Sequence, residues 1–236
     1  MNISVCIATY NGEKYIGNQL DSILSQLNDD DEIIVSDDGS MDRTVEIIEN
    51  YNDKRIRLIR NTGVRNVVSN YENALSCVKG DYVFLSDQDD IWMPAKTKIM
   101  YEALQKSDLA VCDAEIIDAD NNLLYASYYE IRNSGPGFMK NLLKNSYMGC
   151  CMAFRRDILR YILPFPENIA MHDMWIGLCV ELIGTPFFIQ QKLIQYRNHS
   201  ENTTSTAKNK SNIIFYNQVK YRSYLLLNVI KRKLQF

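Results

Sequence analysis

The sequence has 236 residues, of which 46% are hydrophobic and 23% are charged, and this balance excludes a wholly disordered chain. The length fits one large α/β domain better than two small ones. No apolar run approaches the roughly 18 residues that span a bilayer. An apolar strand begins directly after Met1 and Asn2, so we expect no signal peptide.

The six cysteines form no Cys-x-x-Cys pair, and three of them lie in strongly apolar runs. This distribution predicts reduced thiols in the core of a cytoplasmic protein, in place of a disulfide or zinc framework.

The net charge of −3 is unevenly distributed along the chain. Residues 208–236 contain seven basic side chains and no acidic one, which leaves 19 basic against 29 acidic side chains before them. A cationic end on an acidic body indicates an acidic partner surface, and a membrane is the leading candidate.

The first hundred residues alternate apolar strands with amphipathic stretches. Ile3–Thr9 is rich in β-branched residues, which is typical of a buried strand, and apolar residues recur at helical spacing from Ile16 to Leu27. This alternation predicts a mainly parallel sheet flanked by helices. Further strands are predicted over 32–36, 56–59 and 81–85, with helices over 45–51 and 67–78.

The second half is less regular. We expect strands over 109–117 and 147–154, a loop or hairpin over 118–136, a helix over 173–183, and one or two strands over 187–197. The stretch 201–211 is polar, and 213–234 reads as a basic helix.

Three polar segments follow predicted strands of the first half. They begin at Thr9, Asp37 and Asp87. Because ligands bind beyond the carboxyl ends of parallel strands, these segments predict a binding site along one edge of the sheet.

The segment Ser86-Asp87-Gln88-Asp89-Asp90 carries three carboxylates directly after an apolar strand. Carboxylates this close repel one another unless a cation or hydrogen-bond donors neutralise them. Oxygen ligands of this kind suit Mg²⁺ or Mn²⁺ together with a nucleotide diphosphate. The alternative is a solvated acidic turn, with Asp90 capping a helix near Pro94.

Two common nucleotide-binding motifs are absent from the sequence. It contains neither Gly-x-Gly-x-x-Gly nor Gly-x-x-x-x-Gly-Lys-Ser/Thr, which disfavours a nicotinamide-binding fold and a P-loop enzyme. Nucleotide binding must then come from the strand-end loops.

Four ordered motifs resemble the inverting family 2 glycosyltransferases of the GT-A fold. They are Val5-Cys6-Ile7-Ala8-Thr9-Tyr10-Asn11, Ile34-Val35-Ser36-Asp37-Asp38-Gly39-Ser40-Met41-Asp42, Gly80-Asp81-Tyr82 and Leu85-Ser86-Asp87-Gln88-Asp89-Asp90-Ile91-Trp92. The last string looks most like bacterial rhamnosyl- and hexosyltransferases of surface-polysaccharide synthesis. The resemblance covers roughly residues 1–200. Met41 departs from the usual Thr or Ser.

This resemblance implies a GT-A domain over 1–207, with a nucleotide-binding half at 1–100 and an acceptor half at 101–207. It also implies roles for the donor-side residues. Thr9, Tyr10 and Asn11 border the nucleobase. Asp37 or Asp38 forms a hydrogen bond with the base, and Asp37 is preferred. Asp87 contacts the ribose or the donor sugar, and Asp89 binds Mg²⁺ or Mn²⁺ within an Asp87-Gln88-Asp89 motif.

His172-Asp173-Met174-Trp175 resembles the family motif that supplies the general base, which is Asp173 here. Inverting transfer needs one carboxylate to take the proton from the acceptor hydroxyl. An Asp at the start of a helix is also a common N-cap, and the two roles are compatible.

Tyr196-Arg197-Asn198-His199 resembles the downstream motif of the same family. His199 then binds the metal or the diphosphate, and Arg197 pairs with phosphate oxygens. The alternative for His199 is an exposed loop histidine. On the acceptor side, the resemblance implies a role for Gly149. Trp92 and Trp175 are candidates either for the core or for stacking on a sugar, and Trp175 is preferred for the sugar because it neighbours Asp173.

Residues 208–236 are predicted to form a basic amphipathic helix with the composition of an interfacial segment. The alternative is a helix that packs on the domain or in a dimer. We therefore predict inverting transfer from a UDP- or dTDP-sugar to a saccharide or lipid-linked acceptor, peripheral to the inner face of the membrane, with no nucleic-acid partner. Two rival hypotheses are a nucleotidyltransferase and a non-catalytic sugar-nucleotide-binding module.

Overall fold

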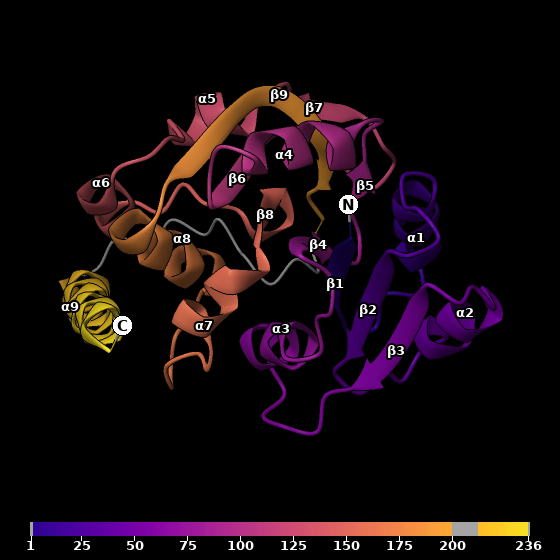
Figure 1. Cartoon of the computed structure of the whole chain (residues 1–236), viewed down its shortest axis with the longest axis horizontal. Coiled ribbons are helices and arrows are strands. Elements are labelled where there is room, and N and C mark those ends of the chain that lie inside the picture. Colours follow the sequence, from indigo (N-terminus) through magenta and orange to yellow (C-terminus); the bar gives the residue numbers. More distant parts are fainter. Residues whose placement is uncertain (1, 200–211, 236) are drawn as a thin grey trace.

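The computed structural model describes residues 2–199 and 212–235. One mixed sheet runs through the described part, in the order β3-β2-β1-β4-β8-β6-β9-β5, and β7 pairs with β6 at its side (Figure 1). The strands are β1 (Ile3–Thr9), β2 (Glu32–Asp37), β3 (Ile56–Arg60), β4 (Tyr82–Asp87), β5 (Ile91–Trp92), β6 (Leu109–Ile117), β7 (Leu123–Tyr125), β8 (Met152–Arg155) and β9 (Pro186–Arg197).

Helices cover both sides of this sheet. In the first half, α3 packs on one face of β1 and β2, while α1 and α2 lie on the other side (Figure 1). The helices are α1 (Ile16–Leu24), α2 (Thr44–Asn50), α3 (Val67–Leu75), α4 (Lys96–Leu104), α5 (Tyr128–Arg132), α6 (Phe138–Leu143), α7 (Leu159–Ile162), α8 (His172–Ile183) and α9 (Asn212–Leu234), with short 3₁₀ turns η1 (Gly149–Cys151) and η2 (Arg156–Ile158).

The first four strands pair in parallel, as the sequence predicts. β1 lies between β2 and β4, and β2 also pairs with β3. Nearly every residue of β1 is buried, because helices cover both faces of the sheet here. The carboxyl ends of β1, β2 and β4 therefore meet at one edge and carry Thr9, Asp37 and Asp87 there.

The second half extends the sheet with a different pattern. β8 runs antiparallel to both β4 and β6, while β6 and β9 pair in parallel. The alternation of strand and helix is lost after α4, which is why the sequence pattern there was less regular.

The sheet curls back toward its own middle. β4 and β5 are separated by β8, β6 and β9 in the sheet, a distance of roughly 19 Å across four strand spacings. Only residues 88–90 join β4 to β5 along the chain, and four steps of extended chain span at most about 14 Å. The sheet must curl to bring the two strands together, and the acidic segment lies where it closes.

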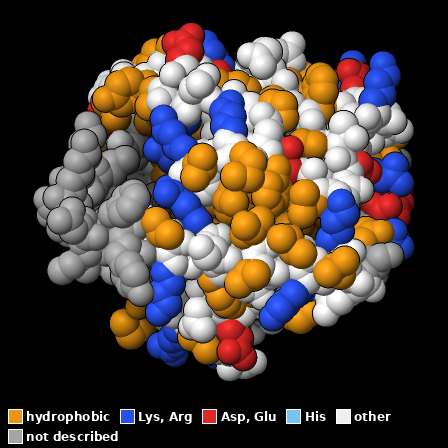
Figure 2. Space-filling model, turned by 90° about the vertical axis from the view of Figure 1, so that its left-hand side faces the viewer, with side chains coloured by type: hydrophobic (Ala, Val, Ile, Leu, Met, Phe, Trp, Pro, Cys, Tyr) orange, Lys and Arg blue, Asp and Glu red, His pale blue; other side chains and the backbone are white. Residues whose placement is uncertain are grey.

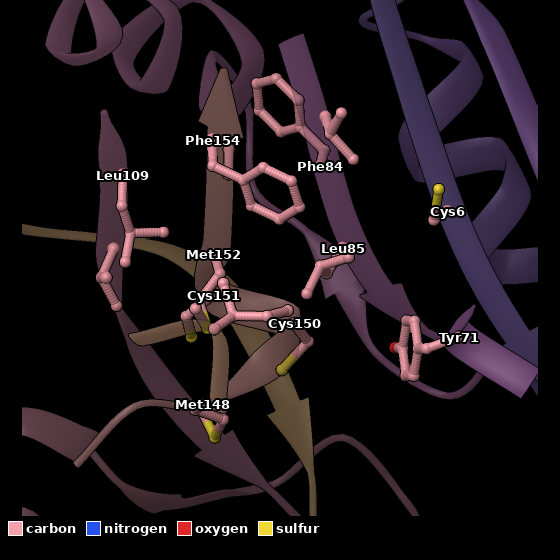
Figure 3. Packing of buried hydrophobic residues seen from close by; sticks show 14 of the residues in the cluster. Cys6, Tyr71, Phe84, Leu85, Leu109, Met148, Cys150, Cys151, Met152 and Phe154 are labelled. Atoms are coloured by element: carbon pink, nitrogen blue, oxygen red, sulfur yellow. The ribbon is translucent and has the colours of Figure 1, made fainter. Parts of the chain in front are cut away.

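The core is continuous across the junction of the two halves. Phe84 and Leu85 of β4 pack against Phe154 and Met152 of β8, with Leu109 of β6 on the far side (Figure 3). Each of these five side chains is completely buried. The predicted halves 1–100 and 101–207 therefore share one sheet and one core within the described residues.

Several predicted elements differ from the structure. The predicted strand over 147–154 begins only at Met152, because Gly149–Cys151 forms a 3₁₀ turn. The predicted loop or hairpin over 118–136 contains β7 and α5. The predicted polar stretch 201–211 and the boundary at 207/208 lie outside the described residues. Among the described helices, none is both long enough and apolar enough to cross a bilayer.

Candidate active site

The acidic segment begins where β4 ends. Asp87 Oδ1 lies 2.6 Å from the phenol oxygen of Tyr71 on α3, which also lies 2.7 Å from the backbone oxygen of Ser86. Burial raises the pKa of the Asp87 carboxyl, and the neighbouring Asp89 carboxylate raises it further. The surroundings of Asp87 at the end of β4 therefore disfavour its ionised form.

Asp90 is buried behind the segment. Its Oδ1 accepts a hydrogen bond from the Arg197 backbone N–H at 3.0 Å, and its Oδ2 has no hydrogen-bond partner in the described structure. Burial and the carboxylates of Asp89 and Asp87 raise the pKa of Asp90. Asp90 does not cap the next helix, because α4 begins after Ala95 and has no side-chain cap.

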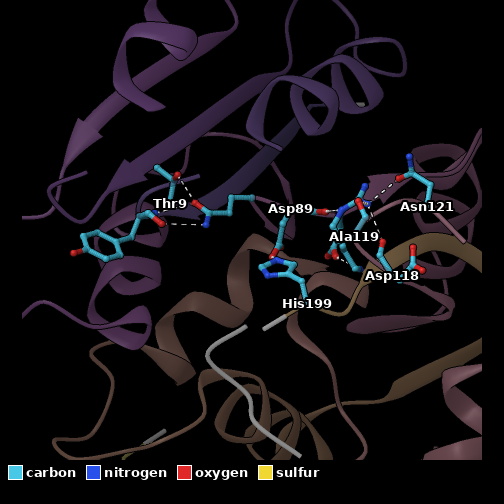
Figure 4. Close-up of polar contacts among 10 residues, drawn as sticks. Thr9, Asp89, Asp118, Ala119, Asn121 and His199 are labelled. Carbon is cyan, nitrogen blue, oxygen red and sulfur yellow. Dashed lines mark hydrogen bonds and ion pairs between the residues drawn. The ribbon is translucent and has the colours of Figure 1, made fainter. Parts of the chain in front are cut away.

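Asp89 meets His199, as the motifs predicted. Asp89 Oδ2 lies 2.8 Å from His199 Nε2 (Figure 4), although the two residues are 110 positions apart in the chain. The antiparallel pairing of β5 with β9 explains the meeting, since Ile91 pairs with Gln195 and the segments beyond them run side by side. The Asp89 carboxylate is a ligand that suits Mg²⁺ or Mn²⁺, and a neutral imidazole nitrogen such as that of His199 is a common metal ligand.

The Arg197 side chain is bonded within the protein, in place of the phosphate contact that the sequence predicted. Its side chain is buried and donates to the backbone oxygens of Asp89 and Asp118 at 2.8 and 3.1 Å, and to Asn121 Oδ1 at 2.8 Å (Figure 4). The guanidinium also lies over the ring of Tyr15, 4.6 Å from its centroid. Arg197 therefore holds the backbone of the acidic segment in place through the hydrogen bond to the Asp89 oxygen.

Gln88 joins the acidic segment to the end of β1. Its Oε1 accepts from Thr9 Oγ1 at 2.6 Å and from the Tyr10 N–H at 2.9 Å, and its Nε2 donates to the Tyr10 oxygen at 3.1 Å. The Tyr10 side chain itself is 47% exposed, so its ring is available to a ligand. Thr9, Tyr10 and the acidic segment thus form one connected edge.

Asn11 and Asp37 hold the adjoining loops together. Asn11 adopts a left-handed backbone conformation, its N–H donates to Ser40 Oγ, and its Oδ1 accepts from the Met41 N–H. Both carboxylate oxygens of Asp37 accept hydrogen bonds from its own turn, from the Gly39 N–H and from the N–H and hydroxyl of Ser40. The side chains of Asn11 and Asp37 are therefore used in hydrogen bonds that hold these loops.

Asp38 differs from Asp37. Its Oδ1 accepts from Asn61 Nδ2 at 2.8 Å, and burial raises the pKa of its carboxyl. Its side chain is not used in the Asp37–Ser40 turn.

Asp173 lies in the first turn of α8, directly after His172. Its Oδ1 accepts the Met174 N–H at 2.6 Å and lies 3.5 Å from Asn145 Nδ2, which also donates to it. Burial raises the pKa of Asp173 to about 7, and Asp87 adds to the increase. Asp173 is not the N-cap, which is Met171. A carboxylate with a pKa near neutrality suits a general base.

Gly149 lies directly beside His172. A Cβ at Gly149 would approach His172 Nε2 to 2.6 Å, so the sequence requires glycine here. His172 is itself buried, its pKa is lowered by burial to about 3, and its ring stacks on Tyr71 with centroids 4.1 Å apart. Gly149 therefore packs against the residue that precedes Asp173, and its predicted role on the acceptor side stays a prediction.

The structure contradicts the predicted acceptor contact of Trp175. The indole is completely buried, and its Nε1–H donates to the Ile162 backbone oxygen at 2.9 Å. On α8, Trp175 points into the packing between α7 and α9, away from solvent, so it cannot stack on a sugar.

Three residues near the site escaped the sequence reasoning. The sequence indicated no role for the side chains of Tyr71, Gln88 and Lys96. Lys96 is fully buried, its Nζ donates to the Cys150 backbone oxygen at 2.7 Å, and it lies 4.4 Å from the Trp92 ring centroid. Lys96 also lowers the pKa of Asp87, because it places a positive charge near that carboxyl. Its position at the start of the helix that follows the acidic segment was the available signal.

Comparison with known proteins decides the family. The sequence profile described as "Glycosyl transferase family 2" matches residues 4–163. The chain belongs to glycosyl transferase family 2. This match covers the four motifs and the whole first half of the sheet.

Curated relatives of this family 2 glycosyltransferase span most of its length. An uncharacterized glycosyltransferase of Haemophilus influenzae is 35% identical over 91% of this chain and 74% of its own. A UDP-Glc:alpha-D-GlcNAc-diphosphoundecaprenol beta-1,3-glucosyltransferase of Escherichia coli is 23% identical over 97% of this chain and 92% of its own. An uncharacterized glycosyltransferase of Rickettsia typhi is 29% identical over 88% of this chain and 67% of its own.

Solved structures show the same fold. TarS 1–349 of S. aureus in complex with UDP-GlcNAc has a TM-score of 0.71 at 20% identity, covering 97% of this chain and 67% of that one. The mannosyltransferase PcManGT of Pyrobaculum calidifontis, in complex with GDP-Man and Mn²⁺, has a TM-score of 0.63 at 18% identity, covering 98% and 73%. The predicted GT-A fold is confirmed, and this family 2 chain is a glycosyltransferase.

Proposed function

We propose that the chain transfers one hexosyl or rhamnosyl unit, with inversion, from a UDP- or dTDP-sugar to a hydroxyl of a saccharide or lipid-linked acceptor. Bacterial surface-polysaccharide synthesis is the setting that this proposal favours. The E. coli relative is named for a diphosphoundecaprenol-linked acceptor and the TarS complex contains UDP-GlcNAc, which support a lipid-linked acceptor and a uridine donor.

One observation carries the proposal. Tyr71 donates a hydrogen bond to Asp87 of the acidic segment, and its ring stacks on His172, the residue before Asp173, so both carboxyl groups adjoin this aromatic pair. The two carboxylates come from different halves of the chain and differ in their surroundings. One is placed to hold the donor and the other to take a proton from an acceptor, which is the division of roles that inverting transfer needs.

The donor is proposed to lie along the joined ends of β1, β2 and β4. Tyr10 presents an exposed ring for the nucleobase, and Thr9 fixes the backbone beneath it through Gln88. Of the adjacent acids, we assign the base contact to Asp38, because both oxygens of Asp37 are used in its own turn. This replaces the preference for Asp37, while Asn11 supports the loop that carries them.

The cation is proposed to be Mg²⁺ or Mn²⁺, held by Asp89 and His199 with Asp87 beside them. When bound, it neutralises the leaving diphosphate. Asp87 contacts the ribose or the donor sugar, and Arg197 keeps Asp89 in place through its backbone oxygen. The buried cation Lys96 offsets part of the repulsion at Asp87, and the Arg197 backbone N–H donates to Asp90.

The acceptor hydroxyl gives its proton to Asp173 as its oxygen attacks the anomeric carbon. The C–O bond to the diphosphate breaks on the opposite face, so no covalent enzyme intermediate is needed. Gly149 lets His172 pack directly against its backbone, and the Met174 N–H and Asn145 Nδ2 orient the Asp173 carboxylate.

Calorimetry with UDP and dTDP, each with and without Mn²⁺, followed by donor hydrolysis and transfer assays, tests this function. We expect metal-dependent nucleotide binding that Asp89→Ala abolishes, and turnover that Asp173→Asn abolishes without loss of nucleotide binding. Near-normal turnover by Asp173→Asn would remove the base assignment. Nucleotide binding without hydrolysis or transfer would favour a binding module.

A further inference from the structure

Helix α9 has one face that packs on the domain. Leu225 and Val229 are buried there, and the Arg232 guanidinium lies 5.6 Å from the ring centroid of Trp175. The hydroxyl of Tyr221 accepts the Ala170 N–H at 3.0 Å, which joins the helix to the segment just before Asp173. The helix is thus fixed to the acceptor side of the site.

The opposite face of α9 is apolar and exposed. Val219, Leu227, Ile230 and Leu234 are 45%, 59%, 42% and 81% exposed. At 100° per residue these four side chains fall within an arc of roughly 80°, on the side away from Leu225 and Val229. A helix that only packed on the domain would have polar residues on this arc.

Basic side chains lie beside this apolar arc. Lys220 and Lys231 are exposed along one side of it, Lys233 is exposed on the other, and residues 208–236 contain no acidic residue. Figure 2 shows hydrophobic side chains across the middle of this face with Lys and Arg side chains around them. This arrangement is typical of a helix that lies in an anionic membrane interface.

Helix α6 continues the same side of the molecule. It lies next to α9 and exposes Met139 and Leu143, at 60% and 56%, together with Lys140 and Lys144. We call the exposed side chains of Met139, Leu143, Val219, Leu227, Ile230 and Leu234, with their neighbouring lysines, the α6–α9 surface.

We propose that the α6–α9 surface docks on an anionic lipid membrane. Its lysines complement anionic headgroups, and its apolar arc enters the boundary of the acyl chains. A second copy of the chain would fit less well, because a symmetric pair of these arcs would bring the same lysines face to face. This inference rests on the proposed function and deepens it.

Docking through α9 would fix the site with respect to the lipid. The hydroxyl of Tyr224 donates to the Glu167 oxygen, and Arg232 donates to the Leu163 and Pro164 oxygens. The segment held in this way leads directly into His172 and Asp173. The surface therefore sets the height of the base above the bilayer, where a lipid-linked acceptor presents its hydroxyl.

Vesicle flotation of the 236-residue protein tests the proposal. The probes are vesicles of equal parts phosphatidylglycerol and phosphatidylcholine, and vesicles of phosphatidylcholine alone. We expect binding to the anionic vesicles only, weakened by salt because screening reduces the attraction of the lysines. The double variant Leu227→Glu, Ile230→Glu should bind about tenfold more weakly.

A matched control is available on the far side of the fold. Leu123 and Leu124 of β7 are 58% and 45% exposed, and changing both to Glu should leave vesicle binding unchanged. Lys220→Glu with Lys231→Glu should remove the preference for anionic vesicles. Donor hydrolysis in solution should be unchanged in each of these variants.

Equal vesicle binding by the wild type and the α9 double variant would overturn the proposal. So would a dimer in light scattering that the double variant dissociates, since a second copy would then cover the face. Vesicle binding without any donor hydrolysis would instead refute the proposed function and leave the surface assignment standing.

Discussion

Gln88 Oε1 lies 2.6 Å from Thr9 Oγ1, so the middle residue of the Asp87-Gln88-Asp89 motif is bonded to the end of β1. Its two flanking acids contact Tyr71 and His199, while Gln88 itself turns toward the end of β1. The side chain also adds two hydrogen bonds to the Tyr10 backbone. The two parts of the donor site are therefore mechanically connected through one side chain.

Gln88→Met keeps the size of this side chain but removes all three hydrogen bonds. We expect the Kd for UDP in the presence of Mn²⁺ to rise roughly tenfold, from a net loss of about 1–2 kcal/mol, with a smaller change in kcat. Gln190→Met, at an exposed position of β9, is the matched control and should leave Kd unchanged. An unaltered Kd in Gln88→Met would show that the connection does not serve the donor.

The pKa of Asp173 predicts opposite effects of pH on activity and stability. As a base, Asp173 must be ionised, so kcat/KM should rise with pH through about 7. The folded state keeps a proton that the unfolded chain releases above a pKa of 3.8. The free energy of unfolding contributed by Asp173 is therefore full below that value and is lost as pH rises through about 7.

Asp173→Asn stays neutral at every pH, so it should be more stable than the wild type above neutrality while losing turnover. Urea unfolding of both proteins across a pH series measures the difference. If the two stability curves ran parallel, the raised pKa would be ruled out.

Gly149→Ala should displace His172, because the added Cβ would lie 2.6 Å from His172 Nε2. We expect a loss of about 1–3 kcal/mol in the free energy of unfolding and a fall in kcat. The cost should shrink in a His172→Ala background, which a double-mutant cycle measures. Gly17→Ala, where the nearest atom to the added Cβ is 3.7 Å away, is the control and should leave the free energy of unfolding unchanged. An equal loss from Gly149→Ala in the wild-type and His172→Ala backgrounds would exclude the clash.

Trp175→Ala should act on stability, since the indole is completely buried. Removing it should lower the free energy of unfolding by about 3–5 kcal/mol. Trp175→Phe should lose the hydrogen bond to Ile162 yet leave the KM for the acceptor unchanged. A raised acceptor KM in Trp175→Phe at unchanged Tm would restore the sugar contact that the sequence suggested.

The sequence predicted the donor side of the site more fully than the acceptor side. β1, β2 and β4 are continuous apolar runs, and a parallel sheet brings their ends to one edge, so Thr9, Asp37 and Asp87 could be placed together from pattern alone. The meeting of Asp89 with His199 required the family motif, because the β5–β9 pairing that causes it has no local signal. β5 has only two residues and is too short to recognise in a sequence.

At other positions, the sequence could not predict the direction in which a side chain points. Trp175 and Arg197 each stand beside a functional motif, but the sequence does not say which face of α8 points inward or how far β9 is buried. Tyr71 reads as an ordinary apolar position of α3, although its hydroxyl reaches Asp87 and its ring reaches His172. Its role depends on two elements that are distant in the chain.

The antiparallel pairing of β4 with β8 limits how such a chain can diversify. Val83 pairs with Phe154 and Phe84 with Ala153, so the ladder and the core cross the boundary between the two halves. Recombination that exchanged one half between two transferases would have to preserve this ladder and its packing together. Changes in the loops beyond the strands leave it untouched. New specificities in this chain should therefore arise by loop replacement, while its two halves are inherited as one unit.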